Sequence, residues 1–347
     1  MSGALDRLRA ALGSPVWVLC GGDSPEREVS LRSGRGVFEA LRLAGMPCEL
    51  VEVEGLSDLL GRLRSGDRPS CAFVALHGGW GEDGRLQALL RSLGIPYTGP
   101  NPASCHLCMD KPFAKAVFEL AGVPTPRWIC LSREAGFVPS EDHLGSLGLS
   151  LPLVVKPASQ GSTVGVSVVE DIGDLPSALE LAFSYGDSIL LESYVAGLEI
   201  TVAVVGGPSL ALALPPVEIS PRGGLYDYAH KYTPGMTEYF SPPRSLDALA
   251  SEGVKEVALR AYLALGCDGY GRVDLRVDAE GRPFVLEVNA APGMTQTSLV
   301  PKAAAAAGLS FPELSALLVL LALEGEAFLE GLFGGGRGIR TPEGSSP

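Results

Sequence analysis

The first hundred residues alternate short apolar runs with amphipathic segments, and no other feature of the sequence constrains the fold as strongly. Apolar runs typical of buried strands occupy residues 16–20, 48–53 and 72–76. Segments with helical spacing follow them at residues 26–43, 56–63 and 83–93. This order predicts a parallel sheet covered by helices, which is an α/β arrangement. Ligands of such sheets bind beyond the carboxyl ends of the strands, so we expect the loops that begin at Gly21 and His77 to border a site.

After residue 100 the segments follow no such regular alternation. The patterns predict helices at residues 110–121, 175–182, 248–265 and from 299 onward. They predict strands at residues 152–156, 164–169, 188–191, 199–205 and 210–219, and a hairpin at 270–289. A polar loop is expected at residues 220–243, and a disordered Gly/Pro/Ser-rich tail from residue 334. This mixture predicts an α+β arrangement beside the parallel sheet.

The composition argues against several classes of protein. A formal net charge of −13, without any run of basic residues, argues against a nucleic-acid partner. The longest apolar stretch, residues 316–323, is far shorter than the roughly 20 residues that span a bilayer, so no membrane association is expected. The chain does not begin with a basic segment followed by a long apolar one, so we expect a cytoplasmic protein.

The seven cysteines are an odd number and lie at scattered positions, mostly inside apolar runs. This pattern is typical of reduced, buried thiols rather than of a disulfide framework. Only Cys105 and Cys108 have the spacing of metal ligands. No second pair accompanies them, so we interpret them as structural residues.

The hairpin at residues 271–289 is the most informative segment, because both of its arms alternate apolar and polar residues. A symmetric turn near residue 280 would place Asp274 opposite Glu287 and Arg272 opposite Asn289. Facing carboxylates repel each other by up to about 1 kcal/mol, and a divalent cation between them reverses that sign. Two carboxylates and an amide oxygen are ligands that Mg²⁺ accepts. The same residues could also form a solvated face, and the spacing alone does not decide between the two.

A glycine-rich loop at residues 156–165 joins two predicted strands. Such a loop can fold over phosphates, although it is also compatible with a plain hairpin loop. It is neither a Walker A motif nor a dinucleotide fingerprint. Compact ammonium groups near it would suit phosphate oxygens, and Lys115 and Lys302 fit solvated surface lysines equally well. Four of the six lysines lie in the middle segment or in the polar loop, at positions Lys111, Lys115, Lys156 and Lys231.

Seven motifs occur in one order along the chain. They are residues 21–30 (GGDSPEREVS), 77–84 (HGGWGEDG), 109–111 (MDK), 156–165 (KPASQGSTVG), 226–232 with YDY and KY, 271–274 (GRVD), and 287–299 with EVN, PGMT and SL. Together they resemble the D-alanine–D-alanine ligases of the ATP-grasp superfamily, from about residue 16 to residue 323. The resemblance implies a Rossmann-like N-terminal domain at residues 1–98 and two ATP-grasp domains, at 99–191 and 192–332. The tail at 333–347 has no counterpart.

The resemblance also implies an activity and its cofactors. One D-alanine carboxylate would attack the γ-phosphate of ATP, and the amine of a second D-alanine would then displace phosphate from the acyl phosphate. Two Mg²⁺ ions would assist, with Mn²⁺ able to substitute. The product would serve peptidoglycan synthesis, and the protein would be a homodimer.

Carried over position by position, the family's nucleotide site implies these roles. Lys111, Lys156 and Lys231 would hold the ATP phosphates, Glu199 the ribose, and the turn from Glu192 to Val195 the adenine. Asp274, Glu287 and Asn289 would ligate the two metal ions. Arg272 and the N–H of Gly293 would stabilise the transferring phosphoryl group and the oxyanion.

The amino-acid site is implied in the same way. Glu26 would bind the first ammonium group near His77, and Ser298 with Leu299 would hold the second carboxylate. Ser162 and Tyr232 would link the glycine-rich and polar loops to Glu26 as a lid.

Several of these residues have a structural alternative. Glu26 could complement a helix dipole, His77 could pack at a strand end, Tyr232 could cover a loop, and Ser298 could be an N-cap. Ala290 stands where many family members have Thr.

Three alternative functions remain open. A D-alanyl-D-lactate ligase is the nearest, and Tyr232 argues for dipeptide formation instead. A ligase for a different acid is disfavoured by Glu26, Ser30 and Ser298-Leu299. A nucleotide-binding relative without catalysis is disfavoured because the Arg272–Asn289 set is intact.

Overall fold

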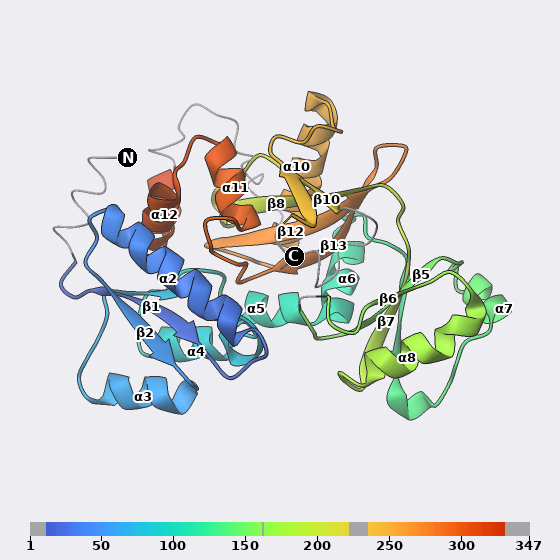
Figure 1. Ribbon diagram of the computed structural model, residues 1–347, viewed down its shortest axis with the longest axis horizontal. Coiled ribbons are helices and arrows are strands. Elements are labelled where there is room, and N and C mark those ends of the chain that lie inside the picture. Colours follow the sequence, from blue (N-terminus) through green and yellow to red (C-terminus); the bar gives the residue numbers. More distant parts are fainter. Residues whose placement is uncertain (1–11, 162, 222–234, 330–347) are drawn as a thin grey trace.

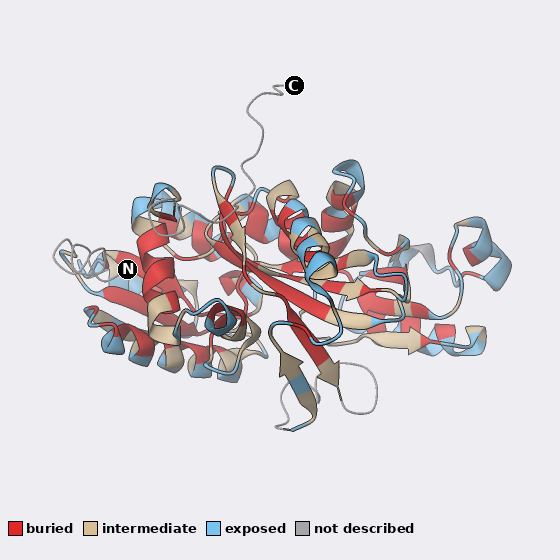
Figure 2. Cartoon of the chain, turned by 90° about the horizontal axis from the view of Figure 1, so that it is seen from above, coloured by how far each residue is buried: buried red, intermediate tan, exposed pale blue. Residues whose placement is uncertain are grey.

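The computed structural model of this protein describes residues 12–161, 163–221 and 235–329 (Figure 1). The expectations for Ser162, Lys231, Tyr232 and the tail at 333–347 therefore lie outside the described residues. Among the described residues, three sheets form the framework. The largest lies between the N-terminal sheet and the sheet of the middle segment, and the strands through the centre are buried (Figure 2).

The N-terminal sheet is parallel, with the strand order β2-β1-β3, as the alternation predicts. Its strands are β1 (Val16–Gly21), β2 (Cys48–Val53) and β3 (Cys71–Val74), and its helices are α2 (Arg27–Leu43), α3 (Leu56–Arg64) and α4 (Arg85–Ser92). All six residues of β1 are buried, because the two faces of this strand contact two different clusters. Val18 packs with α2 and the C-terminal helix α12 (Phe311–Glu324), whereas Leu19 packs with α3 and α4.

The middle sheet is antiparallel, with the order β4-β7-β5-β6. Its strands are β4 (Trp128–Ser132), β5 (Leu153–Pro157), β6 (Ser167–Val169) and β7 (Ser188–Ser193), and α7 (Glu141–Ser146) and α8 (Leu175–Phe183) cover it. The helices α5 (Pro102–Met109) and α6 (Lys111–Leu120) precede it. The elements β4, α5 and α7 are not among those that the sequence patterns predict. The expected boundary between residues 191 and 192 falls inside β7, and the domain boundaries stay predictions.

The third sheet has six strands, in the order β11-β10-β8-β12-β13 with β9 paired to β8. They are β8 (Leu198–Gly206), β9 (Ala211–Ala213), β10 (Val217–Pro221), β11 (Thr237–Phe240), β12 (Tyr270–Val277) and β13 (Pro283–Asn289). Helix α10 (Ala248–Ala264) packs on one face of this sheet, and α11 (Leu299–Ala306) packs against β8 and β10.

Two expectations for this region were wrong. The single strand expected at 210–219 is divided into β9 and β10, because Pro215 and Pro216 between them have no N–H to donate to a ladder. The expected polar loop at 220–243 contains β11, which pairs with β10.

The hairpin β12–β13 has the predicted pairs, with Asp274 opposite Glu287 and Arg272 opposite Asn289. The expected strict alternation of its second arm is wrong, because the register shifts between Asp274 and Leu275. Val285 pairs with Leu275, so Leu286 is one extra residue on β13. Val285 and Val288, three residues apart, are therefore both buried in the same core cluster.

All seven cysteines carry free thiols, and five are buried, whereas Cys48 is half-buried and Cys130 on β4 is exposed. The interpretation as buried thiols is thus wrong for Cys130. The described residues contain no group of three or more His, Cys, Asp or Glu side chains arranged to hold a metal. Within the same residues no single helix is long and apolar enough to cross a membrane. Only α11 and α12 pass that test as a pair, and they are bent by 102°.

Candidate functional site

A cavity of about 670 Å³ lies where the three sheets converge. The structure brings every predicted site residue that it describes into the lining of this cavity. These residues are Glu26, His77, Lys111, Lys156, Glu192, Val195, Glu199, Arg272, Asp274, Glu287, Asn289, Gly293, Ser298 and Leu299. Residues from widely separated segments thus form one site, and their individual roles stay predictions.

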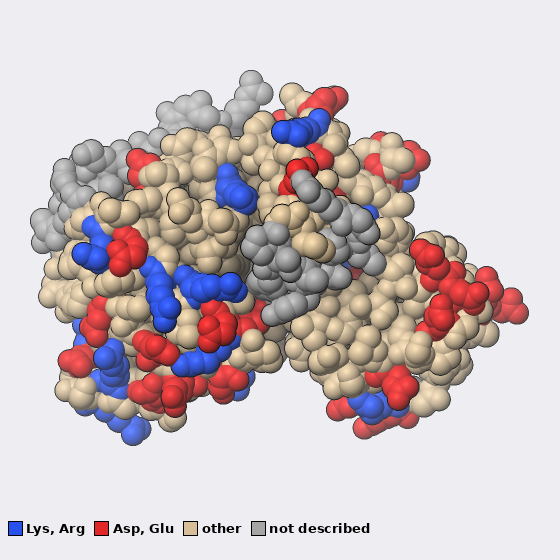
Figure 3. Space-filling model, viewed as in Figure 1, with Lys and Arg blue, Asp and Glu red and all other residues tan. Residues whose placement is uncertain are grey.

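Outside the cavity, the lobe that carries α7 and α8 is acidic on its surface (Figure 3). The exposed acids there include Glu141, Asp142, Asp171, Asp174 and Glu180. Lys156, from the same lobe, is buried and lines the cavity. The net charge of −13 therefore describes the outer surface better than it describes the site.

The hairpin holds Asp274 at the centre of a hydrogen-bonded cluster. Arg272 donates to both carboxylate oxygens, from Nε to Oδ1 at 2.8 Å and from Nη2 to Oδ2 at 2.7 Å. Asn289 Nδ2 donates to Oδ2 at 2.9 Å, and Thr201 Oγ1 on β8 donates to Oδ1 at 2.6 Å. A bidentate arginine–carboxylate pair fixes both side chains in orientation.

The bulge at Leu286 explains why Glu287 belongs to this cluster. Continuing the pairing of Val285 with Leu275 would place Leu286 opposite Asp274 and turn Glu287 to the other face. With the extra residue, Glu287 lies opposite Asp274 and lines the cavity. Its Oε2 lies 3.4 Å from Lys111 Nζ.

Lys111 connects the hairpin with the glycine-rich loop. It is the first residue of α6, which Asp110 caps by accepting a hydrogen bond from the N–H of Phe113 at 3.1 Å. Its Nζ donates to the carbonyl of Gln160 at 2.6 Å. Its backbone N–H donates to the carbonyl of Ala158 at 3.1 Å. Lys111 is thereby a buried ammonium group between the loop and the carboxylates.

Lys115, one helical turn further along α6, is fully buried, so the surface interpretation of this lysine is wrong. It forms an ion pair with Glu192 on β7, which also pairs with Lys156 on β5. Burial is the largest influence on Lys115, and it lowers the pKa of that ammonium group to about 8. Burial alone would raise the pKa of Glu192, but the charges and hydrogen bonds of Lys115 and Lys156 outweigh it and lower that pKa. Lys302 is half-buried, with Nζ 5.2 Å from the ring centroid of Tyr239.

Arg276 is a site residue that is not among the sequence-based predictions. It lies opposite Glu199 across β12 and β8, and Nη1 is 3.2 Å from Glu199 Oε2. Its guanidinium group donates to the carbonyls of Val195 and Gly197, each at 3.1 Å, and lies over the ring of Tyr194. The alternation of β12 was a usable signal, because Arg276 shares a face with Arg272 and Asp274.

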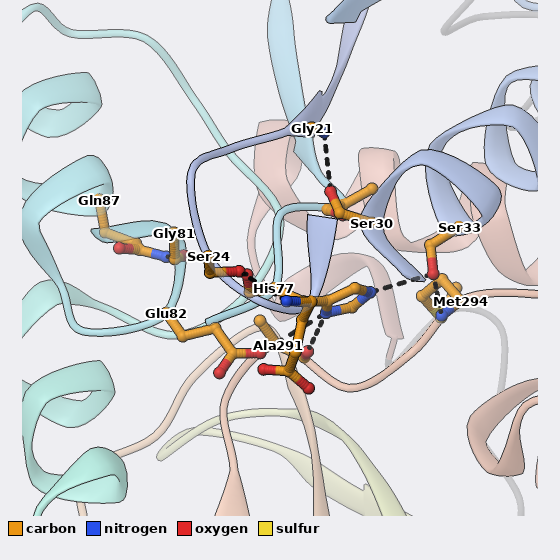
Figure 4. Close-up of polar contacts among 12 residues, drawn as sticks. Gly21, Ser24, Ser30, Ser33, His77, Gly81, Glu82, Gln87, Ala291 and Met294 are labelled. Carbon is orange, nitrogen blue, oxygen red and sulfur yellow. Dashed lines mark hydrogen bonds and ion pairs between the residues drawn. The ribbon is translucent and has the colours of Figure 1, made fainter. Parts of the chain in front are cut away.

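His77 joins the N-terminal sheet to the turn after β13 (Figure 4). Its Nδ1 lies 3.0 Å from the carbonyl of Ala291 and its Nε2 lies 3.0 Å from Ser33 Oγ. Ser33 Oγ also accepts a hydrogen bond from the N–H of Met294 at 3.3 Å. The carbonyl of Ala291 can only accept, so Nδ1 of His77 carries a proton and donates to it.

Glu26 is the N-cap residue of α2, and it makes no side-chain capping hydrogen bond to the described residues of that helix. Its carboxylate lies against two glycines. A Cβ placed at Gly78 would come within 3.0 Å of Glu26 Oε2, and one at Gly161 would come within 3.6 Å. Gly78 also has a φ of +70°, a conformation that favours glycine. Glu26 thus lies between the loop after β3 and the glycine-rich loop.

Ser298 occupies the N-cap position of α11, and its hydroxyl group faces the preceding turn. It accepts a hydrogen bond from the N–H of Thr295 at 3.0 Å and lies 2.8 Å from Thr295 Oγ1. A Cβ at Gly293 would come within 3.2 Å of Ser298 Oγ. The turn and the start of α11 are thereby packed as one unit at the end of the cavity.

A glycine-rich loop and buried lysines that face a carboxylate-bearing hairpin define an ATP-grasp protein. Comparison with known proteins supports the same class. The family model "D-ala D-ala ligase C-terminus" matches residues 117–320, and "D-ala D-ala ligase N-terminus" matches residues 57–100. The chain belongs to the D-alanine–D-alanine ligase family.

Individual relatives cover almost the whole chain. A D-alanine–D-alanine ligase of Bordetella petrii is 46% identical over 310 residues, which are 89% of this chain and 92% of the relative. The solved structure of the Bacillus anthracis ligase complexed with ATP has 35% identity and a TM-score of 0.76, covering 90% of this chain and 98% of that one. The VanG D-Ala:D-Ser ligase of Enterococcus faecalis has 30% identity and a TM-score of 0.74, covering 89% of this chain and 99% of that one.

Proposed function

We propose that this protein ligates two D-alanine molecules to D-alanyl-D-alanine at the expense of ATP. The observation that carries the proposal is the convergence of Lys111, Glu287 and the Arg272–Asp274–Asn289 cluster in one cavity, with Glu26 and Ser298 lining the same cavity. Such an arrangement suits phosphoryl transfer to a carboxylate, in which catalysis is mainly positioning and neutralisation of charge.

In this proposal Lys111 and Lys156 bind ATP phosphates together with Lys231, which lies outside the described residues. Arg276 holds the turn at Val195 against the base and sets the carboxylate of Glu199 for the ribose. Two carboxylates and one carboxamide oxygen form a donor set that fits Mg²⁺. Asp274, Glu287 and Asn289 would hold two such ions, or Mn²⁺ in their place. When bound, the ions would neutralise phosphate charge.

The first D-alanine would place its ammonium group at Glu26 and direct its carboxylate at the γ-phosphorus. A carboxylate oxygen forms the new P–O bond as the bond from the γ-phosphorus to ADP breaks. Ser298 and Leu299 would hold the second D-alanine, whose neutral amine then attacks the acyl carbon. The oxyanion faces Arg272 and the N–H of Gly293 until phosphate leaves with the former carboxylate oxygen and takes up the proton that the nitrogen loses. Ser162 and Tyr232 would close over this step and exclude water.

A phosphate-release assay tests the proposal. D-alanine alone, with ATP and Mg²⁺, should give phosphate and D-alanyl-D-alanine in equal amounts. Absence of phosphate release with D-alanine alone would overturn it. Release only after D-lactate is added would identify a depsipeptide ligase instead. We further propose a role in peptidoglycan synthesis, a cytoplasmic location and a homodimer, the last testable by light scattering.

A further inference from the structure

Lys115 is a buried cation that the proposed mechanism does not use. Its side chain has no exposed surface, and it is absent from the lining of the cavity. Its Nζ pairs with Glu192 and donates to Thr125 Oγ1 at 2.7 Å. Thr125 in turn donates to the carbonyl of Val285, on β13, at 2.8 Å. An ammonium group in such a place is costly unless it compensates a charge.

The charge that it compensates is Glu192. Lys115 pairs with Oε2 of Glu192, and Lys156 pairs with Oε1. Glu192 is 3% exposed and Lys156 is 10% exposed, and both line the cavity. Two ammonium groups and one carboxylate give this triad a formal charge of +1. Without Lys115, the pair of Glu192 and Lys156 would be neutral.

We propose that Lys115 is a positioning residue of the nucleotide site, which neutralises Glu192 so that the charge of Lys156 stays available to ATP phosphates. The inference rests on the proposed function, because it presumes that ATP occupies the cavity. Lys115 acts at a distance from the ligand, through Glu192. An uncompensated charge inside protein attracts an anion far more strongly than a neutral ion pair does, because the surrounding dielectric screens it little.

The charged groups that face Lys115 are Glu192 and Lys156 from the sheet and Glu119 from its own helix. Glu192 and Glu119 favour its protonated form, whereas burial and Lys156 oppose it. The net result is a pKa of about 8. Below that pH the triad carries its positive charge. As the pH rises through about 8, the triad becomes neutral, and the affinity for ATP should fall.

The test is the dissociation constant of ATP with Mg²⁺, without D-alanine, measured by calorimetry on the full chain. Lys115→Met keeps the length of the side chain and removes its charge, and it should weaken ATP binding about 10- to 100-fold. The kcat at saturating ATP should change less than about threefold, because Lys115 does not touch the reacting atoms. Lys255→Met removes one half-buried lysine, paired with Glu252 on α10, and serves as the matched control.

A second pair of variants separates this electrostatic role from a structural one. In a Glu192→Gln background the carboxylate is gone, so Lys115→Met should change ATP affinity less than about threefold. Wild-type affinity should also fall between pH 7 and pH 9, and this fall should be absent in Lys115→Met. The pH dependence of ATP affinity is measured on the wild-type protein, so this part of the test does not depend on whether a variant folds.

Three results would overturn the inference while wild-type protein binds ATP. One is ATP binding by Lys115→Met equal to that of Lys255→Met. Another is an undiminished effect of Lys115→Met in the Glu192→Gln background. The third is wild-type affinity that does not change from pH 7 to pH 9. Failure of the wild type to bind ATP would count against the proposed function itself.

Discussion

Two charged clusters border the same cavity, one of them with Lys115 behind the lining, and water reaches them to different extents. In the triad of Lys115, Glu192 and Lys156 the side chains are 0%, 3% and 10% exposed. In the hairpin cluster, Asp274 is 16% and Glu287 is 26% exposed. The buried triad pairs its one carboxylate within the protein and keeps one positive charge in excess. The hairpin cluster keeps carboxylates within reach of a ligand.

Because of this difference in exposure, the charges of the two clusters have different roles in the site. In the triad, Lys115 acts on the ligand at a distance, through Glu192, whereas Lys156 faces the ligand. Charges in the hairpin cluster can exchange a protein partner for a substrate or a cation. We therefore expect variants of the triad to lose stability and nucleotide affinity, and variants of the hairpin to lose chemistry.

The largest effect is expected at Glu287 in the hairpin cluster. Glu287→Ala should lower ATP turnover by about 10³-fold or more, because it removes a proposed metal ligand. The melting temperature should stay near that of the wild type, since this side chain is only partly buried. A phosphate-release assay measures the turnover, and thermal denaturation measures the melting temperature. Near-normal turnover in this variant would refute the metal assignment.

In the buried triad, Glu192→Gln should lower the free energy of unfolding by about 3–5 kcal/mol, because it leaves two buried lysines without their anion. Because the pKa of Glu192 is lowered in the folded protein, its contribution to the free energy of unfolding depends on pH. Its stabilisation is present above the ordinary pKa of 4.5 and is lost as the pH falls through the lowered value. The stability difference between wild type and variant, from urea unfolding, should thus shrink below pH 4.5. A constant difference down to pH 2 would contradict this account.

A smaller loss is expected for Arg272→Lys, about 100-fold in kcat, since lysine cannot make the bidentate contact with Asp274. Arg282→Lys, in the exposed turn of the same hairpin, is the matched control and should keep wild-type kcat. Equal kcat values for the two variants would mean that the arginine fork has no part in the chemistry.

The smallest effect is expected at Arg276. Arg276→Met should raise the KM for ATP about tenfold with kcat nearly unchanged, because it releases the turn at Val195 and the carboxylate of Glu199. Steady-state kinetics with varied ATP provides the measurement. A fall in kcat at constant KM would place Arg276 in the chemical step instead.

The sequence predicted those parts of the site that depend on local periodicity. Alternation along β12 and β13 was enough to pair Asp274 with Glu287. It could not reveal the bulge at Leu286, because the extra residue is recognised only from the core positions of Val285 and Val288.

Long-range partners account for the remaining differences. Lys115 resembles a surface residue on an amphipathic helix, and only the distant Glu192 on β7 explains its burial. Arg276 carried a signal in its spacing from Arg272, but its contacts with Val195 and Glu199 come from another strand and turn. Sequence spacing cannot reveal such partners, because only tertiary folding brings them into contact.

The most direct test of the central claim, ligation through an acyl phosphate, uses D-alanine with ¹⁸O in its carboxylate. The attacking oxygen stays bound to phosphorus when the second amine displaces phosphate. The account predicts one ¹⁸O atom per molecule of released phosphate, with equal amounts of phosphate and D-alanyl-D-alanine. Released phosphate that contains no ¹⁸O, detected by mass spectrometry, would contradict it.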